Sequence, residues 1–212
     1  MLTNIFQENI ETIRLDANGF SHFYGEKPFH FSTIQDQQIV LVLANQPPVS
    51  IPMEIYVGAK NMEYLNIQYD PNSIGQIITT DFKDYVLLNF LSHEESELLK
   101  PFQDKIEFIP LFLFQMAHLF PIPELLFLID VKDQNLNCAL LIHEELQFIT
   151  HFKLNDDTDC LYHILNICKQ YSIDPARLEL YYSELSETLV ILLKNYMTIS
   201  HLIKPTKNQN LL

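Results

Sequence analysis

Apolar and polar positions follow clear periods along most of this chain. Near the N-terminus, Thr12–Asp16 and Phe20–Tyr24 flank Asn18-Gly19, a residue pair typical of type I′ turns. This pattern predicts a β-hairpin. The next apolar run, Gln38–Ala44, predicts a buried strand that ends before Pro47-Pro48. The chain therefore begins with strands.

The spacing of apolar residues changes after this strand. From Pro52 to Leu65, the residues Ile55, Ala59 and Met62 recur at intervals that place them on one side of a helix. Proline is common in the first turn of a helix. We therefore expect a helix over these residues that buries this side.

The rest of the first half predicts a mixture of strands and short helices. Three apolar runs are expected to be strands: Ile74–Thr80, Tyr85–Leu91 and Lys105–Ile109. Ser92 and Glu95 form the capping-box pattern S-x-x-E, so a helix should begin after Ser92. A second helix is expected from Pro110 to about Phe120.

The second half has a more regular order of elements. We expect three strands, a helix, a strand and a last helix: Leu125–Val131, Leu136–His143, Leu146–Lys153, Asp157–Tyr171, Leu178–Tyr182 and Ser186–His201. Asp156 or Asp157 should cap the first of these helices. Four residues of that helix should face the sheet: Leu161, Ile164, Leu165 and Cys168. This order is the layout of a ribonuclease-H-like lobe.

These elements predict an α/β fold made of two lobes. We expect a divergent N-terminal lobe over residues 1–121, a C-terminal lobe over 122–203 and a tail over 204–212. Pro121 and Pro123 would bracket the crossing between the lobes. The fourth strand of the second lobe should lie beside its first strand.

Composition narrows the possible functions. The net charge of −14 disfavours nucleic acid and membrane surfaces as partners, because both are anionic. The three cysteines show no paired spacing, and the start of the chain lacks the basic and apolar regions of a signal peptide. We therefore expect a cytoplasmic protein with reduced thiols.

Glycine is scarce, which bears on nucleotide binding. The chain has four glycines and none from Gln76 to Leu212, where about ten would be usual. Loops that wrap phosphates rely on glycine for close backbone approach and for positive φ angles. This distribution disfavours a nucleotide enzyme.

Metal motifs are also incomplete. His93-Glu94-Glu95 and His143-Glu144-Glu145 begin like the zinc motif H-E-x-x-H, but Glu97 and Gln147 stand in the fifth position. No metal site and no cofactor are expected.

Several segments together resemble a known bacterial family. These are VSIPMEIY near residue 50, the long block from LLFLIDVKDQNLN to DPARLELYYSEL, and the final LKNYMTI. They resemble the domain-of-unknown-function family 3822, a degenerate branch of the actin-like ATPases related to the pilus-assembly actin homologue. The resemblance covers most of residues 35–200. It implies two ribonuclease-H-like lobes in an actin-like arrangement.

The resemblance also implies where a nucleotide site would lie. In actin-like ATPases the first strand of each lobe ends in an aspartate, and these positions are matched by Asp16 and Asp130. Lys132 stands in the turn that follows the second aspartate, and Tyr182 and Ser183 stand where glycines would admit adenosine. Lys132 would block a phosphate and Tyr182 would fill the nucleoside space. The two aspartates are expected to cap their own hairpin turns.

Two functions from different classes are then possible. The favoured one is a catalytically silent actin-like module, not an enzyme, that binds a protein partner. The alternative is a magnesium-dependent actin-like enzyme that binds or hydrolyses ATP and uses Asp16 and Asp130 with atypical loops.

Overall fold

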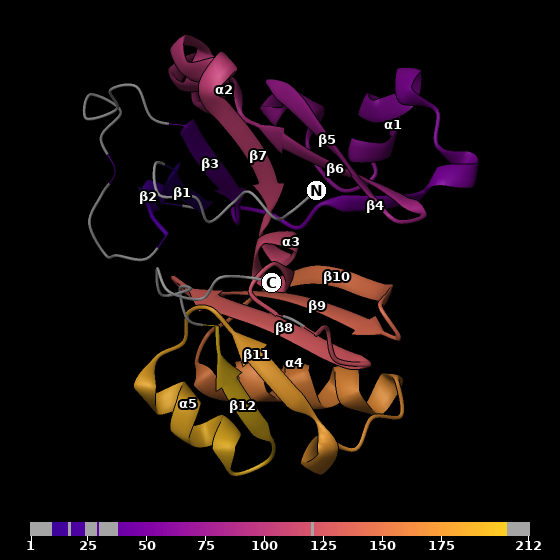
Figure 1. The fold of residues 1–212 in the computed structure, drawn as a ribbon, viewed down its shortest axis with the longest axis vertical. Helices are drawn as coiled ribbons and strands as arrows, with labels where there is room; N and C mark the ends of the chain where they lie inside the picture. Colours follow the sequence, from indigo (N-terminus) through magenta and orange to yellow (C-terminus); the bar gives the residue numbers. More distant parts are fainter. Residues whose placement is uncertain (1–9, 17, 24–28, 30–37, 120, 203–212) are drawn as a thin grey trace. The chain divides into compact units, whose positions relative to one another are not determined.

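A computed structural model describes residues 10–16, 18–23, 29, 38–119 and 121–202. The chain divides into two compact units, Met1–Leu111 and Phe112–Leu212. Figure 1 shows the strands and helices of both units. A lobe boundary at residue 121 and a tail over 204–212 stay predictions.

The first unit is built on a four-stranded sheet with the order β2-β1-β3-β7. Its strands are β1 (Ile10–Asp16), β2 (Gly19–His22), β3 (Gln38–Leu43) and β7 (Ile106–Pro110). β1 and β2 form the predicted antiparallel hairpin, whereas β1, β3 and β7 run parallel. Tyr24, predicted at the end of the hairpin, lies outside the described residues.

A second sheet of the first unit has the order β4-β6-β5. It contains β4 (Val49–Pro52), β5 (Gln76–Phe82) and β6 (Tyr85–Leu91), all antiparallel. The helix α2 (His93–Leu99) follows β6. Its capping box is confirmed: the Glu95 backbone N–H donates to Ser92 Oγ at 3.2 Å, and the Ser92 N–H donates to Glu95 Oε2 at 2.6 Å.

The helix predicted over residues 52–65 is wrong. Pro52 ends strand β4, and three short helices follow: the 3-10 helices η2 (Met53–Ile55) and η3 (Gly58–Lys60) and the α-helix α1 (Asn61–Leu65). Leu65 is buried, but Ile55 and Met62 are 63% and 39% exposed. Gly58 in the middle of the segment disfavours a continuous helix, and no single apolar side is buried.

The second unit has a five-stranded sheet with the order β10-β9-β8-β11-β12. Its strands are β8 (Leu125–Lys132), β9 (Asn135–Ile142), β10 (Glu145–Lys153), β11 (Glu179–Tyr182) and β12 (Thr198–His201). β8, β9 and β10 form an antiparallel meander and β11 lies beside β8, both as predicted, and β11 runs parallel to β8. This is the layout expected for a ribonuclease-H-like lobe.

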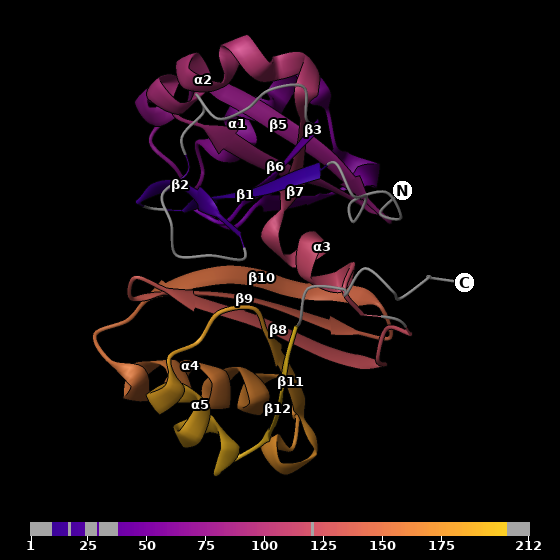
Figure 2. The same cartoon turned by 60° about the vertical axis from the view of Figure 1, so that its left-hand side comes forward.

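Two helices cover one face of this sheet, α4 (Asp157–Gln170) and α5 (Glu187–Lys194) (Figure 2). Asp156 caps α4 by accepting the Thr158 and Asp159 N–H groups at 2.8 and 2.9 Å. Of the residues predicted to face the sheet, Leu161, Ile164 and Cys168 are buried, whereas Leu165 packs at the margin of the core.

The last predicted helix is too long. α5 ends at Lys194, and Thr198–His201 form β12, which pairs in parallel with β11. Thr198 and Ile199 are β-branched and favour a strand where a parallel neighbour is available. Within the described ranges, no helix is long and apolar enough to cross a membrane.

Candidate functional site

Polar side chains gather at the carboxyl ends of parallel strands in both units. In open α/β sheets this edge is where ligands bind. Asp16 is the last residue of β1 in the first unit. In the second unit, Asp130 lies near the end of β8 and Ser183 directly follows β11.

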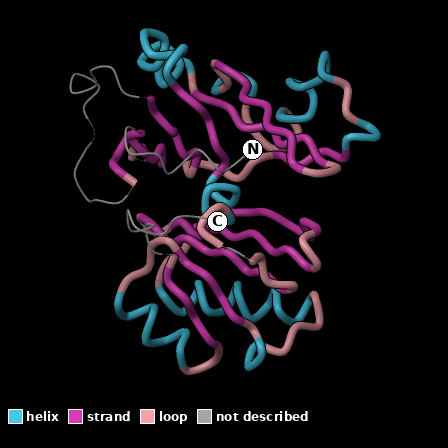
Figure 3. The backbone as a smooth tube through the Cα atoms, in the orientation of Figure 1, coloured by secondary structure: helices cyan, strands magenta, loops and turns pink. Residues whose placement is uncertain are grey.

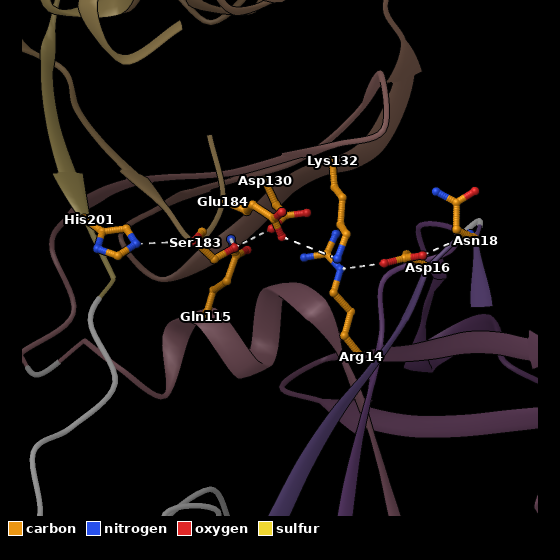
Figure 4. Close-up of polar contacts among 9 residues, drawn as sticks. All are labelled: Arg14, Asp16, Asn18, Gln115, Asp130, Lys132, Ser183, Glu184 and His201. Atoms are coloured by element: carbon orange, nitrogen blue, oxygen red, sulfur yellow. Dashed lines mark hydrogen bonds and ion pairs between the residues drawn. The ribbon is translucent and has the colours of Figure 1, made fainter. Parts of the chain in front are cut away.

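In the first unit, Asp16 stabilises its own turn. Its Oδ1 accepts the Asn18 backbone N–H at 2.9 Å (Figure 4), which confirms the predicted capping role. Its Oδ2 lies 3.4 Å from Arg14 Nε. The side chains of Arg14 and Asp16 are only 2% and 8% exposed. The pair is therefore a buried ion pair, in which the loss of either charge is costly.

In the second unit, Asp130 is held by a different kind of contact. Ser183 Oγ donates to Asp130 Oδ1 at 2.5 Å (Figure 4). Asp130 is fully buried and pairs in register with Asn137 of β9, so it lies within the strand and before the turn. The expectation that Asp130 caps its own hairpin turn is wrong. Its carboxylate instead ties β8 to the residue after β11.

A glutamine from helix α3 (Leu111–Met116) completes this cluster. Gln115 Nε2 donates to the Ile129 carbonyl at 2.9 Å and to Ser183 Oγ at 3.0 Å. Gln115 is itself buried. The Ser183 hydroxyl thus accepts from Gln115 while it donates to Asp130, so its position is fixed on two sides.

The rim of this cluster carries two more contacts. Lys132 Nζ lies 3.8 Å from Glu184 Oε2, and the Lys132 side chain is 20% exposed. His201 Nε2 lies 3.3 Å from the Ser183 carbonyl. The residue predicted to obstruct a phosphate therefore has an ion-pair partner within its own unit (Figure 4).

The turn between β8 and β9 bends without glycine. Asp133 and Gln134 have φ angles of 50° and 61°, the left-handed region that glycine adopts at least cost. Two residues with side chains therefore occupy this turn. That the turn obstructs a phosphate stays a prediction.

Tyr182 lies on the opposite side of the sheet from Asp130. It is in register with Ile129 and packs against the core formed with α4 and α5, and its ring lies 4.9 Å from His201. The structure thus places Tyr182 in the core margin, not beside the Asp130 carboxylate. Of the five residues nominated from sequence, Asp130 and Ser183 are in direct contact.

Sequence reasoning missed Gln115, Arg14 and Glu184. Gln115 carried a signal, because it is the one amide in the apolar run Leu111–Met116. Arg14 also carried one, since it is a lone cation between apolar residues of a strand. Glu184 had no such signal: its contact with Lys132 depends on where β11 lies in the sheet.

The cysteines do not form a reactive site. Cys138, Cys160 and Cys168 are free and buried. Burial raises the pKa of Cys160 to about 12 and that of Cys168 to about 11, and it also raises the pKa of Cys138. Among the described residues, no group of three or more His, Cys, Asp or Glu side chains could hold a metal ion.

Comparison with known structures defines the fold class. A Bacteroides thetaiotaomicron protein with an actin-like ATPase fold and unknown function matches with a TM-score of 0.68 and 17% identity, over 91% of this chain and 90% of that chain. The fold is therefore that of the actin-like ATPases, as predicted. The PilM–PilN type IV pilus biogenesis complex also matches, with a TM-score of 0.48 and 10% identity over 79% of this chain and 70% of that chain.

Sequence comparison defines the family. The model described as "Protein of unknown function (DUF3822)" matches residues 28–198. The chain belongs to this family. No curated protein matches it in sequence.

Proposed function

We propose that this protein is a catalytically silent actin-like module that acts in the cytoplasm by binding another protein. The observation that carries the proposal is the state of Asp130. Its Oδ1 accepts from Ser183 Oγ at 2.5 Å, and the carboxylate has no solvent exposure. A magnesium ion at this strand end would need carboxylate oxygens that are open to the ion and its waters.

The surroundings of Asp130 fit a nucleotide phosphate poorly. The Asp133-Gln134 turn presents side chains, and Lys132 is held beside Glu184 at 3.8 Å. A phosphate cradle needs successive backbone N–H groups at close range, and a glycine-free turn hinders that approach.

Binding of a protein is supported by the apolar surface of the first unit. Several large apolar side chains there are exposed although the surrounding backbone is well hydrogen-bonded. Exposed apolar side chains that concentrate in one region often mark a binding site. An intact fold with an engaged aspartate is consistent with selection for shape and for a partner.

A thermal shift experiment tests catalytic silence. With 5 mM ATP and MgCl2 we expect no rise in the melting temperature of the wild-type chain, because a ligand stabilises only a state that it binds. The variant Ser183→Gly introduces a glycine beside Asp130 and removes the hydroxyl that donates to its carboxylate. A nucleotide-dependent rise in the melting temperature of this variant, but not of the wild-type chain, would support the account.

The alternative is a magnesium-dependent ATP enzyme that uses Asp16 and Asp130. One observation favours it: each aspartate lies near the carboxyl end of the first strand of its own unit. A melting shift of several degrees in the wild-type chain with ATP and magnesium, but not with magnesium alone, would establish this alternative instead.

A further inference from the structure

Exposed apolar side chains are concentrated in one short segment. Among the described residues nine large hydrophobic side chains are exposed, and five of them lie between residues 53 and 67: Met53, Ile55, Val57, Met62 and Ile67. Their exposed fractions range from 39% to 84%. We call the exposed apolar side chains of this segment the 53–67 surface. The segment connects β4 to β5 (Figure 3).

Hydrogen bonds and a ring contact define the backbone of this segment. Tyr64 supports it: the Tyr64 hydroxyl donates to the Ile55 carbonyl at 3.0 Å and accepts the Val57 N–H at 3.2 Å. The Tyr56 and Tyr64 rings stack with centroids 6.3 Å apart.

Both ends of the segment are anchored. Leu65 is fully buried in the core with Ile51 and Leu88. At the start, the Met53 N–H donates to the Asp84 carbonyl at 2.7 Å. The segment therefore presents apolar side chains outward from a fixed base, as the centre of a protein interface does.

The residue types suit recognition of a protein. Methionine and tyrosine are enriched in interfaces, and methionine adapts to varied apolar surfaces. Exposed charged residues of the segment, at Asp70 and in the β5–β6 turn are mostly acidic: Glu54, Glu63, Asp70, Asp84, Lys60 and Lys83. Lys60 is partly neutralised because its Nζ lies 3.5 Å from Glu63 Oε2. Acidic residues therefore outnumber basic ones in and next to the segment.

We propose that the 53–67 surface docks a protein segment with an apolar stripe flanked by lysine or arginine. This inference rests on the proposed protein-binding function and names its surface and the chemistry of its partner. The negative charge of this chain favours a basic partner. Two copies of a chain with net charge −14 repel each other, and so do this chain and an anionic membrane. Basic residues on the partner are attracted to these acidic residues.

A selection from a random peptide library tests the proposal. The full chain is the bait for a phage-displayed library of 16-residue peptides, and enriched peptides are synthesised and measured by fluorescence anisotropy. The test variant is Ile55→Ser/Ile67→Ser, at side chains that are 63% and 84% exposed. The matched control is Leu98→Ser/Ile191→Ser, at side chains that are 51% and 66% exposed and lie outside the surface.

The proposal expects enriched peptides that combine apolar residues with flanking Lys or Arg. Their affinity should fall at least tenfold in Ile55→Ser/Ile67→Ser and stay unchanged in the control. Glu54→Lys should weaken binding of the basic peptides more at low salt than at high salt. Salt screens the attraction between acidic residues of this chain and basic residues of the peptide. Unchanged melting temperatures confirm that all variants are folded.

Five results would overturn the proposal. Peptides that bind the test variant as tightly as wild type would reject the surface but leave the protein-binding function standing. Peptides with acidic flanks, or no enrichment, would reject the partner chemistry. Binding to phosphatidylglycerol vesicles that is lost in the test variant would assign the surface to lipid. Self-association by analytical ultracentrifugation that is lost in the same variant would assign it to a second copy.

Discussion

The two hairpins that begin the sheets of the two units show how the same position in a lobe can take different roles. In the first unit, Asp16 accepts from the Asn18 N–H in its own turn and pairs with Arg14. In the second unit, Asp130 accepts from Ser183, which is 53 residues away in the chain. The first aspartate stabilises a local turn, and the second joins two parallel strands. The two aspartates therefore occupy similar positions in their units but have different roles.

The turns of the two hairpins differ in the same way. Gly19 has a φ of 100° in the first hairpin, and glycine adopts this angle without strain. In the second hairpin, Asp133 and Gln134 hold positive φ angles with full side chains. A lobe that must bring backbone close to a phosphate cannot easily tolerate those side chains, whereas a lobe that keeps only its shape can.

The largest effect should come from the buried ion pair of the first unit. Asp16→Asn keeps an oxygen for the Asn18 N–H but removes the charge beside Arg14, which is 1% exposed. We expect a loss of about 3–5 kcal/mol in the free energy of unfolding, measured by urea denaturation. The matched control is Asp174→Asn, whose ion pair with Arg177 is exposed, so its removal should change stability little.

A loss below about 1 kcal/mol for Asp16→Asn would contradict this account. It would mean that Asp16 acts as a turn cap alone and that the charge of Arg14 is balanced elsewhere.

The next effect concerns the link between β8 and β11. Ser183→Ala removes the hydroxyl that donates to the buried Asp130 and accepts from Gln115. We expect a loss of about 1–3 kcal/mol by urea denaturation, because buried polar groups lose a partner. Ser183→Thr keeps the hydroxyl and should lose less. Equal losses in both variants would show that the hydroxyl contributes nothing specific.

Removing a glycine from the first turn and adding one to the second should change stability in opposite directions. Gly19→Ala places a side chain at a φ of 100°, and although no atom lies within 4 Å of the added Cβ, the backbone angle is strained. We expect a loss of about 1 kcal/mol. Gln134→Gly relieves a φ of 61° and should gain about 0.5–1 kcal/mol. Thermal denaturation measures both changes, and two changes of the same sign would disprove the reading of these turns.

The last prediction concerns the reactivity of the thiols, all of which lie in the second unit. At pH 8 the folded protein should react with iodoacetamide at least about a hundredfold more slowly than the urea-unfolded chain, because the thiols are buried and their pKa values are raised. The rate of alkylation at increasing urea then reports unfolding of the second unit alone. Rapid labelling without urea would contradict the packing assigned to α4.

Much of this fold follows from local sequence signals. The hairpin at Asn18-Gly19 and the helix capped by Ser92 and Glu95 are both present. The signals work because turn and cap chemistry acts within a few residues, whatever the rest of the chain does. The position of β11 beside β8 was also predictable from the order of the elements.

The errors arose where tertiary contacts decide the structure. The spacing of Ile55, Met62 and Leu65 suggested a buried helical side, but only Leu65 is buried. Periodicity alone cannot distinguish an apolar side that packs in the core from apolar residues that remain exposed. β12 was missed because its strand conformation depends on pairing with β11.

The sequence identified some members of the candidate site but none of the contacts between them. Asp130 and Ser183 were nominated from sequence, but a hydrogen bond across 53 residues requires the strand order of the sheet. Tyr182 could not be placed from sequence for the same reason. Its side chain lies on the sheet face of Ile129 because the two residues are in register, and that register depends on how β11 pairs with β8.

Isothermal titration calorimetry with ATP and MgCl2 tests the central claim most directly. The account predicts no binding with a Kd below about 1 mM, an affinity worth about 4 kcal/mol. Micromolar binding that is lost in Asp130→Ala, with the variant shown to be folded by its circular dichroism, would contradict the account and establish a nucleotide-dependent protein.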